Sequence, residues 1–370
     1  MSGRTSLAIL LLLIATAAPI PVGLQLTATA SAQPSSNSVS AHRIQHVVII
    51  MMENHGYSQV IGSSSAPYQN MLAGKYALAS AYYAVTHPSL PNYIAITAGS
   101  TLGVTDDCEP SQCGNIGATN VADLLNSAGL SWKEYAESMP VPCDKSPTTL
   151  YDVNHNPFVY YRDVVNNTAY CDTHVVPLGN VTSASGPFFS DLNSGSFPNF
   201  SFVTPNICDD AHSCPLSVGD KWLSTFVPEI LGSHVFNSTV IFITYDEGSS
   251  NSGYGVAHGG RVPLIVVGPP SIVNHTVTQV EFDHYSLLAT VEAIFGLDSL
   301  GRYDISANLL SPIIPELSGA SPPTQILPGS SYTPPPSSFL GGTDGVAAIV
   351  VFVVLLALGY LAFRRSRRVR

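Results

Sequence analysis

Four short runs of almost entirely apolar residues, each ending abruptly at polar ones, constrain the fold of this chain most strongly. They lie at 46–52, 200–204, 239–245 and 262–268 and are rich in valine, isoleucine and phenylalanine. Such runs are typical of strands buried on both faces of a parallel sheet. Helical patterns occur at 121–130 and at 285–297, the latter with Asp283 as a candidate cap and Gly296 at its end. We therefore predict an α/β fold with helices on both faces of the sheet.

The first 32 residues have the organisation of a secretory signal peptide. Arg4 supplies the positive start, residues 7–18 form the apolar stretch, and small residues precede the predicted cleavage site. The alternative is an uncleaved membrane anchor. Pro19 and Pro21 interrupt the apolar run well before the roughly 20 residues that a span requires. We expect cleavage, followed by a short linker at 33–43.

The C-terminal end has the pattern of a membrane anchor. Residues 345–363 are an uninterrupted apolar run, and five arginines follow within 364–370. A basic cluster beside a span stays cytoplasmic, so a transmembrane helix would leave the N-terminal bulk outside the cell. A buried core helix would not end in five arginines. Residues 319–344 are rich in proline, serine and glycine, which predicts an extended stalk. We therefore expect a catalytic domain at 44–318 on the cell surface.

The charge of the exported part excludes one class of partner. Between residues 33 and 340 the sequence has 8 lysines and arginines against 24 aspartates and glutamates, a formal charge of −16. A protein that binds nucleic acid normally carries a basic patch, which eight scattered residues cannot form. We therefore expect an acidic exterior and no nucleic-acid partner, and nothing in the sequence indicates an obligate protein partner.

All six cysteines lie in the exported part, which favours disulfides. Pairing of sequence neighbours would give three bonds, Cys108–Cys113, Cys143–Cys171 and Cys208–Cys214. A zinc cluster is the alternative, but the chain contains no pair of the form CxxC. Five sequons for N-glycosylation agree with an exposed, exported domain; they begin at Asn166, Asn180, Asn199, Asn237 and Asn274.

Polar side chains follow three of the predicted strands, where ligands bind in α/β folds. Alone, each residue is more typical of a cap or a turn, and the prediction of a site depends on their convergence. Lone histidines outside this pattern are interpreted as surface or turn residues: His42, His155, His174 and His275. The converging residues are Glu53 and Asn54, then Asn206, Asp210 and His212, then Asp246 and Glu247, with His258 just before the fourth strand.

Ser89 is the candidate nucleophile. It lies between two prolines in a predicted rigid turn that precedes the apolar segment 94–97. No G-x-S-x-G elbow surrounds any serine, which makes a Ser-His-Asp hydrolase triad unlikely. A metal ion held by Glu53, Asn54, Asp246 and Glu247 could activate the hydroxyl instead. Oxygen ligands favour Mg²⁺, Ca²⁺ or Mn²⁺, whereas histidine would favour zinc, so the identity of the divalent ion stays open.

Together these motifs resemble the phosphoesterase family of bacterial acid phosphatases and phospholipases C, within the alkaline-phosphatase superfamily. Five motifs occur in the family's order over roughly residues 44–300; they are Met52-Glu53-Asn54-His55, Ser89-Leu90-Pro91-Asn92-Tyr93, Thr204-Pro205-Asn206 with Asp210 and His212, Thr244-Tyr245-Asp246-Glu247-Gly248, and His258-Gly259-Gly260-Arg261-Val262-Pro263. The resemblance implies an alkaline-phosphatase-like α/β/α sandwich. Asp283-His284-Tyr285-Ser286 is also similar to the family, but we interpret it as the start of a helix.

The resemblance also implies roles for the site residues. Ser89 would be the phosphorylated nucleophile and a metal ligand, and Glu53, Asn54, Asp246 and Glu247 would complete the metal site. His212 would contact the phosphoryl group or protonate the leaving group, and His258 would be a further phosphate or metal contact. The second choices are Asn206, Asp210 and His87, and His87 could equally be a base, a phosphate contact or a turn residue.

The expected activity is hydrolysis of a phosphorylated small molecule through a phosphoserine. A sulfatase is excluded because Tyr93 stands where that motif needs arginine. Phospholipases C of the family are often longer, and this chain passes from about residue 300 to the stalk, which favours an acid phosphatase. Phospholipase C activity remains the alternative within the class. An inactive surface or adhesion protein on the same scaffold is the alternative from another class, although such a protein would be expected to have lost part of the site.

Overall fold

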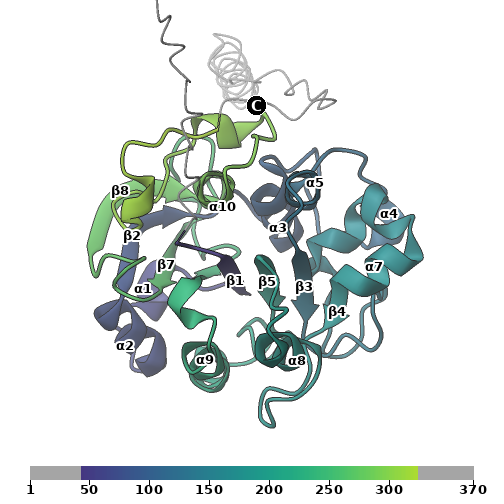
Figure 1. The fold of residues 1–370 in the computed structure, drawn as a ribbon, viewed down its shortest axis with the longest axis horizontal. Helices are drawn as coiled ribbons and strands as arrows, with labels where there is room; N and C mark the ends of the chain where they lie inside the picture. Colours follow the sequence, from purple (N-terminus) through teal and green to yellow (C-terminus); the bar gives the residue numbers. More distant parts are fainter. Residues whose placement is uncertain (1–42, 324–370) are drawn as a thin grey trace, which may run out of the picture. The chain divides into compact units, whose positions relative to one another are not determined.

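The computed structural model describes residues 43–323, whose framework is a mixed eight-stranded sheet (Figure 1). The strand order is β4-β3-β5-β1-β6-β7-β2-β8. The strands, in chain order, are β1 (His46–Met52), β2 (Ala77–Tyr83), β3 (Trp132–Ala136), β4 (Val175–Pro177), β5 (Phe200–Thr204), β6 (Thr239–Tyr245), β7 (Arg261–Val267) and β8 (Val277–Asp283). All four runs that the sequence analysis singled out are strands, and three of them, β5, β1 and β6, are neighbours at the centre.

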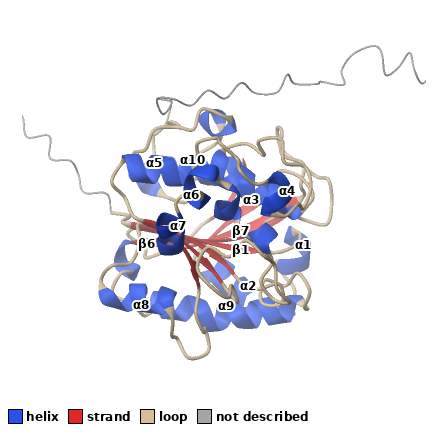
Figure 2. Cartoon of the chain, turned by 90° about the vertical axis from the view of Figure 1, so that its right-hand side faces the viewer, coloured by secondary structure: helices blue, strands red, loops and turns tan. Residues whose placement is uncertain are grey.

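Helices cover both faces of this sheet, as Figure 2 shows, with α3, α5 and α10 on one side and α2, α8 and α9 on the other. The α-helices are α1 (Tyr57–Val60), α2 (Pro67–Lys75), α3 (Ser89–Ala98), α4 (Pro110–Cys113), α5 (Val121–Ser127), α6 (Arg162–Val165), α7 (Thr168–His174), α8 (Pro187–Ser194), α9 (Leu216–Leu231) and α10 (His284–Phe295). Short 3₁₀ helices are η1 (Val153–His155), η2 (Pro157–Tyr160), η3 (Phe236–Ser238), η4 (Tyr303–Ser306) and η5 (Pro315–Leu317). The described chain is thus a three-layer α/β/α sandwich.

The prediction that all four apolar runs are parallel strands is wrong for β7. β1 is parallel to β5 and β6, but β7 is antiparallel to both of its neighbours, β6 and β2. A loop without a helix joins β6 to β7, and antiparallel neighbours, unlike parallel ones, need no crossover helix. Because β7 runs in reverse, the segment before it lies at the same edge as the carboxyl ends of β1 and β6.

Burial on both faces explains why the central strands are so apolar. Every residue of β5 and β6 is buried, as is β1 from Val47 onward. The loops that follow these strands supply the polar residues that end each run, so the composition changes abruptly at the sheet edge. The sequence therefore records where each strand ends.

The two predicted helices are present with slightly different bounds. α5 ends at Ser127, and α10 begins at His284 rather than Tyr285. Asp283 caps α10, its carboxylate accepting a hydrogen bond from the Ser286 backbone N–H at 2.8 Å. Gly296 ends the helix in the left-handed conformation, with φ of 61°.

The three predicted disulfides, Cys108–Cys113, Cys143–Cys171 and Cys208–Cys214, are all formed. Each of them fixes a loop or short helix beside the strands rather than the sheet itself. Within residues 43–323 no helix combines the length and the apolar character needed to cross a membrane. The predicted signal peptide, most of the stalk, the anchor and the basic tail lie outside the described residues.

Candidate active site

Three carboxylates from three different strands meet at the carboxyl edge of the sheet. Glu53 directly follows β1, Asp246 directly follows β6, and Asp210 lies in the loop after β5. Because β1 is paired with both β5 and β6, these ends are neighbours in space. Two backbone hydrogen bonds fix the arrangement, from Glu53 N–H to the Asp210 carbonyl at 3.0 Å and from Asp246 N–H to the Met52 carbonyl at 2.9 Å. All three side chains are almost fully buried.

Ser89 lies against this cluster. It is the first residue of α3, so the prediction of a turn that precedes a separate apolar segment is wrong: the helix begins at the serine itself. The Ser89 hydroxyl donates a hydrogen bond to Glu53 Oε2 at 3.2 Å. The positive end of the helix dipole thus lies at the hydroxyl, which favours negative charge there.

The charged forms of the Glu53 and Asp246 carboxyls are disfavoured in this site. Burial, reinforced by the charges of Asp246 and Asp210, raises the pKa of Glu53 well above its usual range. Burial also raises the pKa of Asp246. One Asp246 oxygen accepts the Asn54 backbone N–H at 2.9 Å, whereas Oδ2 is buried without a hydrogen-bond partner among the described residues. A divalent cation would relieve this repulsion, so the donor set fits a metal ion.

His155, which the sequence analysis interpreted as a surface or turn residue, is buried in this site, and that interpretation is wrong. Its Nε2 lies 3.4 Å from Glu53 Oε1 and its Nδ1 lies 3.2 Å from Asp210 Oδ2. Its ring stacks on Tyr93 at 5.4 Å, and the Tyr93 hydroxyl donates to Glu53 Oε1. Burial alone would lower the pKa of His155, but the hydrogen bond and charge of Asp210 raise it. The ring therefore links the two carboxylates.

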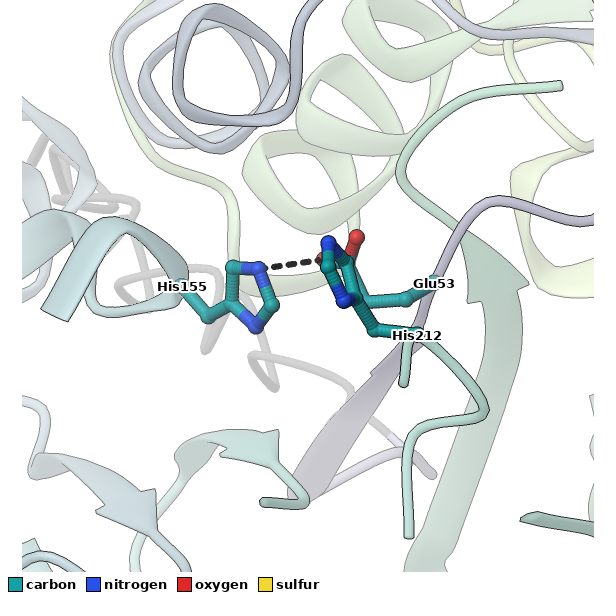
Figure 3. A group of neighbouring side chains, drawn as sticks. All are labelled: Glu53, His155 and His212. Carbon is teal, nitrogen blue, oxygen red and sulfur yellow. Dashed lines mark ion pairs between the residues drawn. The ribbon is translucent and has the colours of Figure 1, made fainter. Parts of the chain in front are cut away.

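His212 lies near the Glu53 carboxylate and belongs to the loop after β5 (Figure 3). Glu53, His155 and His212 each offer one ligand atom, and these atoms lie within 4.8 Å of one another. His155 is buried, whereas His212 is exposed at the mouth of the site. The backbone N–H of His212 donates to Asp210 Oδ1 at 2.7 Å, which positions the loop. One carboxylate with two histidines is a donor set suited to zinc, while Glu53 with Asp246 and Ser89 forms an oxygen set.

Three other predicted residues, Glu247, His258 and Asn206, have side-chain partners or neighbours outside the carboxylate cluster, whereas Asn54 contacts the cluster. Glu247 pairs with His87, Oε2 to Nδ1 at 3.0 Å, and burial followed by the charge of Asp246 raises the pKa of Glu247 to about 8. His258 is exposed and lines a separate cavity together with His87. The Asn206 side chain donates to Asp209 Oδ2 at 2.7 Å and so shapes the loop after β5. The Asn54 side chain lies 3.4 Å from Glu53 Oε2.

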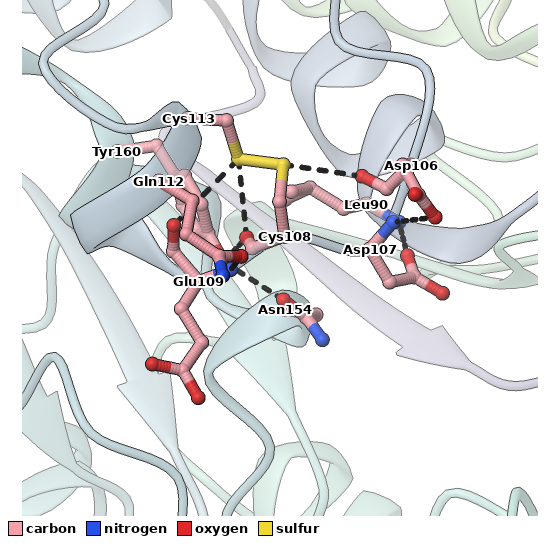
Figure 4. Close-up of a disulfide and its surroundings, with 9 residues drawn as sticks. All are labelled: Leu90, Asp106, Asp107, Cys108, Glu109, Gln112, Cys113, Asn154 and Tyr160. Carbon is pink, nitrogen blue, oxygen red and sulfur yellow. Dashed lines mark hydrogen bonds between the residues drawn. A yellow bond between two sulfur atoms is a disulfide. The ribbon is translucent and has the colours of Figure 1, made fainter.

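Two further residues support the site and were not predicted. His284 is buried, with Nε2 donating to the Asp246 carbonyl at 2.7 Å and Nδ1 accepting from the Tyr82 hydroxyl at 2.8 Å. Burial lowers the pKa of His284 to about 4, which keeps the ring neutral. Asp107 accepts the Leu90 backbone N–H at 2.9 Å and thereby caps the start of α3 (Figure 4). His284 was visible in sequence as part of a family-like motif, but nothing marked Asp107.

Comparisons with known proteins identify the family of this chain. The model of the phosphoesterase family matches residues 63–298. An acid phosphatase of Aspergillus fumigatus is 34% identical over 274 residues, which cover 70% of this chain and 57% of that protein. A phosphatidylinositol-3-phosphatase of Mycobacterium tuberculosis is 31% identical over 260 residues, which cover 69% of this chain and 78% of that protein.

A solved structure shares the fold. A protein of the alkaline phosphatase superfamily from Vibrio parahaemolyticus superposes with a TM-score of 0.51 at 14% identity, covering 70% of this chain and 69% of that one. The chain spans less than two thirds of the length of several fungal relatives that it matches, between 57% and 64%.

Proposed function

Because the chain belongs to the phosphoesterase family, we propose that it is a phosphoric-ester hydrolase. More specifically, the proposed activity is that of a metal-dependent phosphomonoesterase of the acid phosphatase type. It would act through a phosphoserine at Ser89. The observation that carries the proposal is the Ser89 hydroxyl at the start of α3, hydrogen-bonded to a buried carboxylate cluster at 3.2 Å. Both relatives described above are named phosphatases, which supports a monoester substrate.

The residues of the chain supply most of the proposed chemistry. Ser89 donates its hydrogen to Glu53, which leaves the lone pairs of its Oγ available for attack on a phosphorus atom. The start of α3 stabilises negative charge on the phosphoryl oxygens. His212, exposed at the mouth, is placed to contact the same oxygens. Transfer to Ser89 forms the Oγ–P bond as the P–O bond to the leaving group breaks; the Ser89 proton passes to Glu53, and the leaving oxygen takes a proton from His212 or water. Water then hydrolyses the phosphoserine to free phosphate and restores the Ser89 hydroxyl.

A divalent ion would be held by Glu53, with Asp246, Asn54 and Ser89 or with His155 and His212 as further ligands. When bound, it would neutralise charge on the phosphoryl group and on the attacking oxygen. Burial raises the pKa of Glu53 and of Asp246, two of the groups that would bind the ion. Their charged forms are therefore destabilised unless a cation is bound. Secretion and anchoring through residues 345–363 are part of the same proposal, because they place the site outside the cell.

The test is phosphate release from a generic phosphomonoester between pH 3 and 8, with and without chelator. We expect Ser89→Ala to lower the rate at least about a thousandfold. Ser224→Ala, which removes a hydroxyl that donates to the Lys221 carbonyl at 2.6 Å, is the matched control and should leave the rate unchanged. Rapid acid quenching with labelled substrate should trap phosphate on the wild-type chain but not on Ser89→Ala.

Metal content is a separate measurement. Asp246→Asn should contain less tightly bound metal than the wild type, since it loses a charged ligand. A fully active Ser89→Ala protein would remove the serine from the mechanism, and unchanged metal in Asp246→Asn would refute the oxygen ligand set.

A further inference from the structure

A cavity of about 480 Å³ lies beside the nucleophile and has no role in the site described above. It is bounded by the end of β2, the loop after α3, the loop before β7, and the aromatic residues Tyr285 and Tyr303. Its size is that of a small-molecule pocket. We propose that this cavity is the leaving-group subsite, and that it accepts an uncharged leaving alcohol carrying a compact apolar ring.

Two short connections along the chain place the cavity next to the reacting centre. His87 lines it and is two residues before Ser89, so the two Cα atoms are at most about 7 Å apart. His87 also pairs with Glu247, which directly follows Asp246. On another wall, Thr105 is two residues before Asp107, whose carboxylate caps the helix that begins at Ser89. The cavity therefore adjoins the site both at His87 and at Thr105.

The walls of the cavity are rigid. Backbone hydrogen bonds join His258 N–H to the Val85 carbonyl at 2.7 Å and Gly259 N–H to the Ala84 carbonyl at 2.8 Å. At Gly259 an added Cβ would lie 2.4 Å from the Thr86 carbonyl oxygen, so glycine permits this close approach. The Cys108–Cys113 disulfide and the Tyr160 hydroxyl, which donates to the Cys108 carbonyl at 2.8 Å, hold the opposite loop (Figure 4). A preformed pocket loses little entropy on binding.

The lining determines the class of leaving group. Val85, Val104 and Tyr285 are buried apolar walls, and the Tyr285 and Tyr303 rings lie 4.9 Å apart at 35°. This pair offers aromatic surface to a planar ring. None of the lining residues is a lysine, arginine, aspartate or glutamate. A leaving group that carries a further phosphate would find no lysine or arginine there, and His87, one of the two lining histidines, already pairs with Glu247, which favours an uncharged group.

A larger cavity, of about 600 Å³, is a poorer candidate for the same role. Glu137, Asp209 and Lys221 line it, so its charged groups have both signs. Neither Ser89 nor any residue within two positions of Ser89 lines this cavity. The apolar cavity beside His87 is thus the better match.

The test compares benzyl phosphate with ethyl phosphate, whose leaving alcohols are of similar acidity and differ by the ring. The inference rests on the proposed phosphomonoesterase activity. We expect kcat/KM to be about 30-fold higher for benzyl phosphate, which corresponds to about 2 kcal/mol for burial of the ring. Tyr303→Ala should lower the benzyl-to-ethyl ratio about fivefold, and Val256→Asp, at a side chain already 53% exposed, should also lower it.

Tyr76→Ala is the matched control, because it removes a partly buried tyrosine that does not line the cavity, and it should leave the ratio unchanged.

myo-Inositol 1-phosphate offers a ring of similar size with polar hydroxyl groups. The inference is overturned if benzyl and ethyl phosphate are hydrolysed equally well, if inositol phosphate is preferred to benzyl phosphate, or if Tyr303→Ala lowers both rates equally. Failure to hydrolyse any of the three would instead refute the proposed function.

Discussion

Glu134 provides a direct test of how the buried carboxyls of this domain affect its stability. It lies in β3, fully buried, with Oε1 accepting a hydrogen bond from the Thr204 hydroxyl at 2.8 Å. Its Oε2 is buried and has no hydrogen-bond partner among the described residues. Burial therefore raises the pKa of Glu134 well above 4.5, its ordinary value. Glu134→Gln keeps an acceptor for Thr204 and removes the titration, and the amide NH2 that replaces Oε2 changes stability by an amount that does not depend on pH.

The sign of the effect follows from the direction of this shift. Between the unfolded and the folded pKa of Glu134, the native state binds more protons than the unfolded state, so the free energy of unfolding falls as pH rises. The stabilisation from Glu134 is fully present below the unfolded value near 4.5 and is lost as the pH rises through the folded value. One proton gives a slope of up to about 1.4 kcal/mol per pH unit, or about 2 kcal/mol between pH 5.5 and 7.

The assay is urea unfolding followed by tryptophan fluorescence, which reports on buried Trp132 in the same strand and on buried Trp222. Wild type and Glu134→Gln are compared from pH 5 to 8 at one fixed metal concentration. We expect the variant to gain stability relative to wild type as pH rises. Glu281→Gln, at an exposed glutamate, is the control and should follow the wild-type curve. Parallel curves for wild type and Glu134→Gln would refute the reasoning.

Two further predictions concern the histidines that support the site. His155→Gln removes a ring that pairs with two buried carboxylates, so metal content measured by elemental analysis and kcat should both fall, and a variant unchanged in both would contradict the role inferred for the ring. His284→Phe leaves the Asp246 carbonyl without its side-chain donor and should cost about 1–3 kcal/mol in urea unfolding, together with lower kcat; full activity would show that this contact does not position Asp246.

The central strands could be predicted because their burial on both faces requires a composition that few other structures need. The same reasoning identified Glu53 and Asp246, since each directly follows such a strand. The direction of β7 was beyond this reasoning. An apolar strand has the same composition in either orientation, and the orientation depends on how the connecting loop runs.

The histidine at the centre of the site could not be predicted in the same way. His155 lies at the end of the 3₁₀ helix η1, in the long connection between β3 and β4, and no nearby strand or periodic pattern marks it. Its position depends on contacts with Tyr93 and Asp210, which are 62 and 55 residues away in sequence. The position of Asp107 and the leaving-group cavity likewise depend on loops that are distant in sequence and lie side by side in the fold.

The sequence by itself determined the α/β class, the ends of the strands and the carboxylates that follow them, because burial and strand termination leave a local pattern. Pairing of sequence neighbours suggested the disulfide partners, and the structure decided among the fifteen possible connectivities. Only the tertiary structure decided which polar side chains contact one another. His155 pairs with Glu53, whereas Glu247 pairs with His87. Side-chain contacts between distant loops depend on the packing of the whole sheet, and no local pattern records them.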